Sequence, residues 1–351
     1  MADTSRVLRV SAIGRRIPVT LGLAGVLLMV GVVSGGLWSP FSASPVFPDV
    51  AYGLPALAEG RWWTPFTGTF FVSAPWVYLA GIPAVAAMAF FEYRRGSRVA
   101  AVLFAGGQIF SVLAAAAFLA VASLLPWSWA QGQAAVLDVG PSGGVFACIA
   151  GALALLPSPW RLRAWTVFVA ILAVVFVYYG SLPDLEHVFA VGLVLAVDRS
   201  LRPQRVSVRE QRLIAFVVVC ALGAIEILGY LAPMTGPFGT SAATSGSWID
   251  VAINTAVVLV VATSLRRGRR WAWVVVLLYC LLNVLLVVAI IGILIAVGLS
   301  GIEAGIDTDV TSVLASSVLW ILASAYFLLV RGAFRARPRA ALGEAPRADG
   351  R

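Results

Sequence analysis

The sequence has few charged residues, one histidine and three cysteines, and the shortage of charge narrows the class of protein most. Only 12% of the 351 residues are charged, whereas 61% are hydrophobic, and the mean hydropathy is +0.96. A soluble globular domain does not carry so much apolar surface, but a polytopic membrane protein does. The composition therefore predicts an all-α protein whose helices cross a membrane several times.

Sequence patterns that bind metals or nucleotides are absent. The chain contains no CxxC, HExxH, GxGxxG or P-loop motif, so we expect neither a cofactor nor a metal ion. Cys148, Cys220 and Cys280 all lie inside apolar stretches, where a thiol is more often a packing residue than a disulfide partner. The sequence thus offers no support for metal, nucleotide or disulfide chemistry.

Ten apolar stretches alternate with polar segments along the chain. They cover residues 17–37, 69–91, 99–125, 143–157, 163–180, 185–197, 213–233, 249–264, 271–298 and 311–330. With a cytoplasmic N-terminus, the arginines fall on the cytoplasmic side, and Arg61 is the exception. Because basic residues near membrane ends resist translocation, this bias predicts ten transmembrane helices with both chain ends in the cytoplasm. The first stretch is interpreted as an uncleaved helix, since no A-x-A site follows it.

The formal net charge of +9 comes mostly from these cytoplasmic arginines. Because topology explains most of this charge, we expect no nucleic-acid partner, although anionic lipids would be attracted.

The pattern of apolar stretches divides the chain into a six-helix membrane domain over residues 1–200 and a four-helix membrane domain over 201–332. An Arg-, Pro- and Ala-rich cytoplasmic tail follows over 333–351. We expect it to be disordered, and it is either a simple end or a linker to a further domain.

The segment DVGPSGG, residues 138–144, stands directly before the short fourth stretch. In one interpretation Gly140, Pro141 and Ser142 form a turn and an N-cap; in the other, Ser142 is a nucleophile. His187 is the only histidine and opens the sixth stretch, which runs inward from the same side of the membrane. His187 is either a polar residue hydrogen-bonded to a nearby carbonyl or the general base that activates a serine nucleophile. Because ionisable groups at membrane depth are usually functional, we predict that Ser142 and His187 meet in one aqueous pocket.

These features resemble the rhomboid intramembrane serine proteases. GPSGG begins a short fourth helix, a histidine lies on the sixth, EGRWWTPFT lies in the first outside loop, and AFFEYRRGSRVAAVLF is similar to the family's Glu-x-x-x-Gly-Ser stretch. The resemblance covers residues 15–200. It implies that Ser142 is the nucleophile, that His187 is the general base, and that Phe146 is an aromatic platform under the imidazole. The backbone N–H groups of Ser142 and Gly143 would bind the oxyanion, and a membrane-spanning protein would be cleaved near the outer face.

Two residues depart from the rhomboid pattern at a position that matters for catalysis. Alignment on Thr67 places Val77 and Gly81 where active members carry a His and an Asn that donate to the oxyanion. Loss of one such donor typically costs a factor of 10²–10³ in rate. The departure therefore puts proteolysis in doubt and keeps a non-catalytic rhomboid-like protein, which binds helices or lipids, as an alternative.

Asp138 and Glu186 flank the predicted dyad. Glu186 adjoins His187 and so points about 100° away from it on a helix, while Asp138 is a candidate to hold His187 or a loop in place. The interpretation we favour for both acids is a solvated charge that faces the outside. Six tryptophans near the predicted outer interface are interpreted as an anchoring belt. They are Trp38, Trp62, Trp63, Trp127, Trp129 and Trp248.

The last four apolar stretches keep a third function open. A rhomboid-like core, four further helices and an Arg-rich exit also resemble the membrane half of bacterial aminoacyl-phosphatidylglycerol synthases. The soluble transferase domain of those proteins is not among these 351 residues, so transfer chemistry is carried over to none of them, and the resemblance implies lipid handling in a bacterial cell membrane. Glu226, the one acid well inside the seventh stretch, has a role that the sequence does not indicate.

Overall fold

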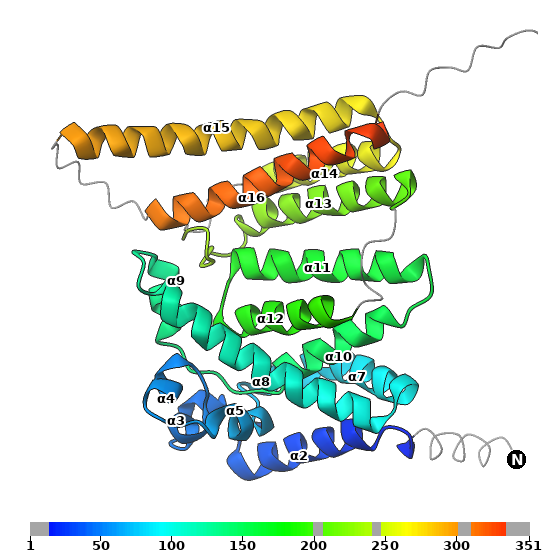
Figure 1. The fold of residues 1–351 in the computed structure, drawn as a ribbon, viewed down its shortest axis with the longest axis vertical. Helices are drawn as coiled ribbons and strands as arrows, with labels where there is room; N and C mark the ends of the chain where they lie inside the picture. Colours follow the sequence, from blue (N-terminus) through cyan, green and yellow to red (C-terminus); the bar gives the residue numbers. More distant parts are fainter. Residues whose placement is uncertain (1–13, 199–205, 241–246, 301–309, 335–351) are drawn as a thin grey trace, which may run out of the picture. The chain divides into compact units, whose positions relative to one another are not determined.

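The computed structural model describes residues 14–198, 206–240, 247–300 and 310–334, and within these ranges the chain is helical and forms no strand (Figure 1). Each of the ten predicted stretches coincides with a helix, and the second is broken into two at Gly81. The helices are α2 (Pro18–Ser34), α6 (Pro75–Ala80) with α7 (Ile82–Arg95), α8 (Ser97–Ala122), α10 (Ser142–Ala154), α11 (Trp160–Tyr178), α12 (Leu182–Val197), α13 (Val208–Leu228), α14 (Trp248–Arg266), α15 (Arg270–Ser300) and α16 (Val310–Leu329). The predicted all-α fold is confirmed.

Seven spans in the described ranges are long and apolar enough to cross a membrane. α2 and α10 are shorter apolar helices of 17 and 13 residues, and α12 has 16 residues. At 1.5 Å per residue, α10 is about 20 Å long, which is less than the roughly 30 Å of a hydrocarbon core. The structure therefore supports a multi-pass membrane protein with seven candidate spans, while the predicted count of ten is not confirmed.

The described chain forms two compact units. The first comprises the described parts of Met1–Gln204, Ala224–Ser245 and Ala304–Ala315. Its boundary at residue 204 lies close to the predicted boundary at 200, but the two later segments belong with it as well. At its centre α8, α10 and α12 pack against one another, and α7 packs against α8 and α10 (Figure 1).

Glycines allow α8 and α10 to approach closely. A Cβ atom at Gly107 would lie 2.4 Å from the Cβ of Ala147, and one at Gly144 would lie 2.5 Å from the carbonyl oxygen of Phe104. Real side chains never come so near, so larger residues would push the helices apart. Small residues at such contacts are the usual means by which membrane helices pack. The second glycine after Ser142 therefore has a structural reason that is independent of catalysis.

Glu92 on α7 holds the start of α2. Its Oε1 accepts a hydrogen bond from the Val19 N–H at 2.9 Å, and its Oε2 accepts bonds from the N–H and hydroxyl of Thr20 at 2.8 Å and 2.7 Å. The first N–H groups of a helix have no intrahelical acceptor and carry partial positive charge. A carboxylate that is 0% exposed thus satisfies donors that would otherwise be buried without a partner.

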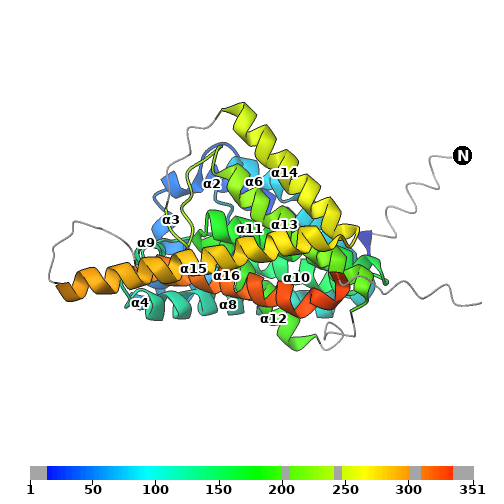
Figure 2. The same cartoon turned by 90° about the horizontal axis from the view of Figure 1, so that it is seen from above.

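The long outside segments contain short helices and are joined to each other. α3 (Phe47–Val50), α4 (Leu54–Ala58) and α5 (Thr64–Thr67) lie in the first, and α9 (Ser128–Ala134) lies in the second. α3, α4 and α9 are at the same end of the first unit (Figures 1 and 2). Tyr52 and Asp138 exchange two backbone hydrogen bonds, of 2.9 Å and 2.8 Å, so the first segment is tied to the chain just before α10.

The tryptophan belt is only partly observed. Trp38, Trp62, Trp63 and Trp248 are 70%, 68%, 54% and 77% exposed, as an interfacial belt requires. The interpretation is wrong for Trp129, which is 6% exposed and donates its indole N–H to Gly180 O at 2.6 Å. Trp127 is half-buried and donates to Pro237 O at 2.9 Å. Both indoles hold loops inside the first unit, because each N–H finds a carbonyl acceptor there.

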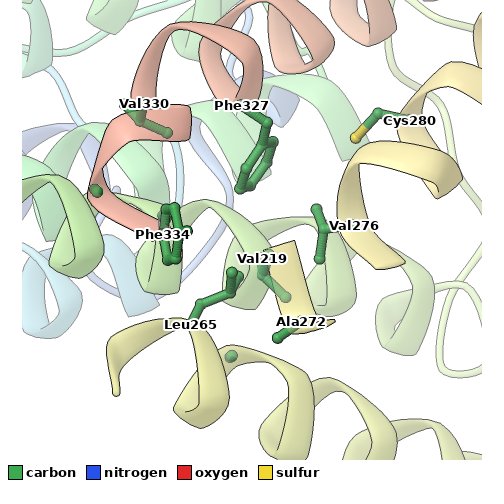
Figure 3. Packing of buried hydrophobic residues seen from close by; sticks show 11 residues of the cluster. Val219, Leu265, Ala272, Val276, Cys280, Phe327, Val330 and Phe334 are labelled. Carbon is green, nitrogen blue, oxygen red and sulfur yellow. The ribbon is translucent and has the colours of Figure 1, made fainter. Parts of the chain in front are cut away.

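The second unit comprises the described parts of Arg205–Gly223, Gly246–Glu303 and Ser316–Arg351. Its core is apolar and is drawn from several helices and from the 3-10 helix Val330–Phe334 (Figure 3). Ala333 and Phe334 are 2% exposed, and Ala333 O accepts two hydrogen bonds from the Arg212 guanidinium at 2.9 Å and 2.7 Å. These two residues belong to the core and not to the predicted tail, whose remaining residues, 335–351, lie outside the described ranges.

The cysteines are free thiols, as predicted. Cys148 and Cys280 are buried in the cores of the two units, and Cys220 is half-buried. Their surroundings are apolar side chains, so their role is packing.

Candidate functional site

The turn before Ser142 is held by buried hydrogen bonds. Gly140 has a φ of +146°, a conformation that an L side chain rarely adopts. Its N–H donates to Gly68 O at 3.0 Å, and its carbonyl oxygen accepts bonds from the Tyr52 hydroxyl and the Gln108 amide, both at 2.9 Å. With all of its backbone polar groups bonded, Gly140 fixes where α10 begins.

Gln108 completes the first turn of α10 from the neighbouring helix α8. Its Oε1 accepts a hydrogen bond from the Gly144 N–H at 2.9 Å, and the residue is 1% exposed. Gln108 is not among the site residues that the sequence predicts. The sequence feature that could have identified it is its position: Gln108 is an amide within the apolar stretch 99–125. Polar groups at membrane depth usually have a partner or a function.

Ser142 is the first residue of α10 and not its N-cap. Pro141 occupies the N-cap position and supplies no side-chain acceptor, so the N-cap interpretation of Ser142 is wrong. The N–H groups of Ser142 and Gly143 belong to the first turn, where helix geometry provides no intrahelical acceptor. A Cβ atom at Gly143 would lie 2.1 Å from Ser111 Oγ, so this glycine too is required by the contact with α8.

His187 lies in the second turn of α12, after a capping box formed by Ser181 and Asp184. Its ring stacks on Phe146, with centroids 3.8 Å apart and planes inclined by 5°. Phe146 follows Ser142 by four residues, and residues at this spacing share one face of a helix. Ser142 therefore lies on the face of α10 that meets α12 at His187. The catalytic role of each of these residues stays a prediction.

The hydrogen bond that a serine–histidine dyad needs is absent from the structure. The Nε2 atom of His187 is buried and has no hydrogen-bond partner among the described residues. The imidazole is thus placed by its contact with Phe146 and not by a bond to the Ser142 hydroxyl.

The two acids beside the dyad are buried, and the favoured interpretation as solvated charges is wrong. Asp138 is 9% exposed and Glu186 is 1% exposed. The Tyr52 hydroxyl donates its only hydrogen bond to Gly140 O. Neither carboxylate oxygen of Glu186 accepts a hydrogen bond from the part of the chain described here. Both acids are buried because the first outside segment, which Tyr52 ties to Asp138 through backbone hydrogen bonds, lies over them. The sequence pattern alone predicts that they face solvent.

Burial also changes the ionisation of the groups in this loop. It raises the pKa of Asp138 to about 7, and the negative charge of Asp184 acts in the same direction. It raises the pKa of the Tyr52 hydroxyl as well, with a further contribution from the charges of Glu186 and Asp138. Asp138 therefore changes its charge near neutral pH.

The positions aligned with the oxyanion donors carry no side-chain donor. Val77 lies on α6 and packs against the apolar cluster that contains Leu23, Val72 and Met88. Gly81 joins α6 to α7.

Two further features add no chemistry to the site. Glu226 is exposed on α13, and in the described ranges no three His, Cys, Asp or Glu residues are grouped to hold a metal ion.

Comparisons of the chain with protein-family models, with curated proteins and with solved structures find no match. The residues and their geometry are therefore the basis on which a function is proposed.

Proposed function

We propose that this chain is a rhomboid-like intramembrane serine hydrolase that cleaves membrane-spanning proteins through Ser142 and His187. The observation that carries the proposal is the stack of His187 on Phe146, on the face of α10 that Ser142 begins. The turn at Gly140, whose N–H and carbonyl are both bonded, supports it, since a nucleophile needs a fixed position.

Each residue has a defined part in the proposed reaction. His187 Nε2 takes the proton as Ser142 Oγ attacks the substrate carbonyl. The N–H groups of Ser142 and Gly143 donate to the oxyanion that forms. Hydrogen bonds of this kind are often long in unliganded enzymes and shorten when substrate binds, so the free Nε2 is compatible with the proposed role.

The membrane context follows from the same resemblance. We place the chain in a bacterial cell membrane, with the arginine-rich ends of its helices in the cytoplasm and Ser142 towards the outer face. Seven candidate spans support the multi-pass arrangement. The N- and C-terminal residues that would be cytoplasmic, 1–13 and 335–351, lie outside the described ranges.

A non-catalytic membrane protein is the second candidate, and Val77 favours it. The Val77 side chain has no N–H or O–H group to donate to an oxyanion and packs against apolar neighbours. The glycines after Ser142 are explained by helix packing alone. In this alternative the same fold binds helices or lipids, and the four C-terminal helices fit a lipid-handling module equally well.

Labelling with a fluorophosphonate probe distinguishes these candidates. The purified full chain in detergent should be labelled; Ser142→Ala should abolish labelling, and His187→Ala should reduce its rate by about 10² or more. Ser247→Ala is the matched control, because Ser247 is also at the start of a helix but lies in the second unit. The hydrolase proposal fails if the wild type is not labelled, or if Ser142→Ala is labelled at the wild-type rate.

A further inference from the structure

The first unit contains a groove of about 660 Å³ between α7, α8, α10 and α12. Its walls are mainly apolar side chains of two helices, and Gly107 and Gly151 line it where α8, α10 and α7 pack closely. The wall residues are Val99, Val102, Leu103, Leu193, Val194 and Val197. The volume lies within the roughly 300–1,000 Å³ of sites that hold small molecules.

One end of the groove is basic. Arg95 ends α7, Arg98 lies in the first turn of α8, and Asp198 follows the last residue of α12. These three ionisable residues give this rim a formal charge of +1. Both arginines are exposed, and neither forms an ion pair with a carboxylate in the described parts of the chain. Their guanidinium groups are therefore available to an anion.

The opposite end of the groove is open and apolar. Gly106 lies eight residues after Arg98 on α8, which is a rise of about 12 Å. A Cβ atom at Gly106 would meet no atom within 4 Å, so the groove has free space at this depth. The groove thus combines a basic end with an apolar channel that begins beside it.

We propose that this groove binds an anionic glycerophospholipid, with its phosphate at Arg95 and Arg98 and an acyl chain along α8 and α12. A peptide or a polar metabolite would leave hydrogen-bonding groups unsatisfied against the apolar walls. The two arginines favour an anionic headgroup over a zwitterionic one, as in other basic pockets between membrane helices. The arginine bias predicts that this end faces the cytoplasmic leaflet. The inference uses neither Ser142 nor His187 and does not depend on the proposed hydrolysis.

Lipid binding to the purified full chain in detergent tests the inference by native mass spectrometry. Phosphatidylglycerol should bind at least 10-fold more tightly than phosphatidylcholine with the same acyl chains, and glycerol phosphate, which has no chains, should not bind. Arg95→Gln with Arg98→Gln should weaken phosphatidylglycerol binding about 30-fold. Arg94→Gln with Arg163→Gln is the charge-matched control, because both arginines lie outside the groove and each lies over an aromatic ring.

A second pair of variants tests the apolar channel without any change in charge. Gly106→Leu should fill the channel and weaken phosphatidylglycerol binding at least 10-fold. Gly192→Leu should leave binding unchanged, because this glycine also has open space around it but does not line the groove. Equal affinities for the two phospholipids, or equal effects within either pair of variants, would overturn the inference. Tight binding of glycerol phosphate would assign the basic rim to a soluble phosphate and overturn it too.

Discussion

Replacement of Glu92 by alanine removes the contact that joins the start of α2 to α7. The carboxylate is 0% exposed and accepts three hydrogen bonds, at 2.9, 2.8 and 2.7 Å. In the Glu92→Ala variant, the N–H groups of Val19 and Thr20 and the Thr20 hydroxyl lose their acceptor. The change therefore affects stability and leaves the residues of the proposed dyad in place.

The expected loss of stability follows from the number of donors. A hydrogen bond to a charged group is worth about 1.5–3 kcal/mol, so three of them set an upper limit of about 9 kcal/mol. Val19 is only half-buried, and water replaces part of what its N–H loses. Removal of one partner of a buried charged contact typically costs about 3–5 kcal/mol, and we expect a loss in this range.

Equilibrium unfolding in mixed micelles, followed by tryptophan fluorescence, measures this loss. Glu59→Ala is the control, because Glu59 forms an ion pair with Arg61 at 2.7 Å but its side chain is 65% exposed. Because the Glu59 carboxylate lies mostly in solvent, we expect its loss to cost about 0–1 kcal/mol. A double-mutant cycle of Glu92→Ala with Thr20→Val isolates the shared contact and should show a coupling of about 1–3 kcal/mol. If Glu92→Ala costs no more than Glu59→Ala, the reasoning is wrong.

Three further predictions concern the site and its packing. Gly140→Ala places a side chain at a φ of +146°, which should cost about 1–3 kcal/mol of stability and slow fluorophosphonate labelling. Gly107→Val meets Ala147 Cβ and should cost about 1–3 kcal/mol, whereas Gly106→Val should not, because its surroundings are open; thermal unfolding compares the two. For Asp138, the folded pKa of about 7 lies above the ordinary value of 3.8. Its stabilising contribution is complete below pH 4 and is lost as the pH rises to 7, so the Tm of the wild type should fall over this interval, and that of Asp138→Asn should fall less.

Each of these has a result that would contradict it. A Gly140→Ala variant with unchanged stability would show that the turn relaxes. Equal losses for the two valine variants would show that close packing of α8 and α10 is not the cause. An identical pH dependence of Tm in Asp138→Asn and the wild type would assign the effect to other groups.

The positions of the helices are determined by local sequence. A run of apolar residues has one way to satisfy its backbone in a membrane, which is to form a helix, so all ten predicted stretches coincide with helices. The glycine-rich turn before Ser142 and the histidine on α12 are also evident in the chain, and one contact between their helices, that of Phe146 with His187, has the geometry that the family resemblance implied.

The surroundings of the proposed dyad were decided by tertiary structure alone. Asp138 and Glu186 look like solvent-facing charges because they stand between apolar stretches, yet the first outside segment buries both of them. Gln108 lies 36 residues before Gly144 in sequence and still supplies its hydrogen-bond acceptor. Hydropathy is a sum over neighbours in the chain, whereas burial and hydrogen bonding depend on which segments meet in space. For that reason the sequence alone determined the helices and the candidate nucleophile and base, and only the folded structure determined which polar groups surround them.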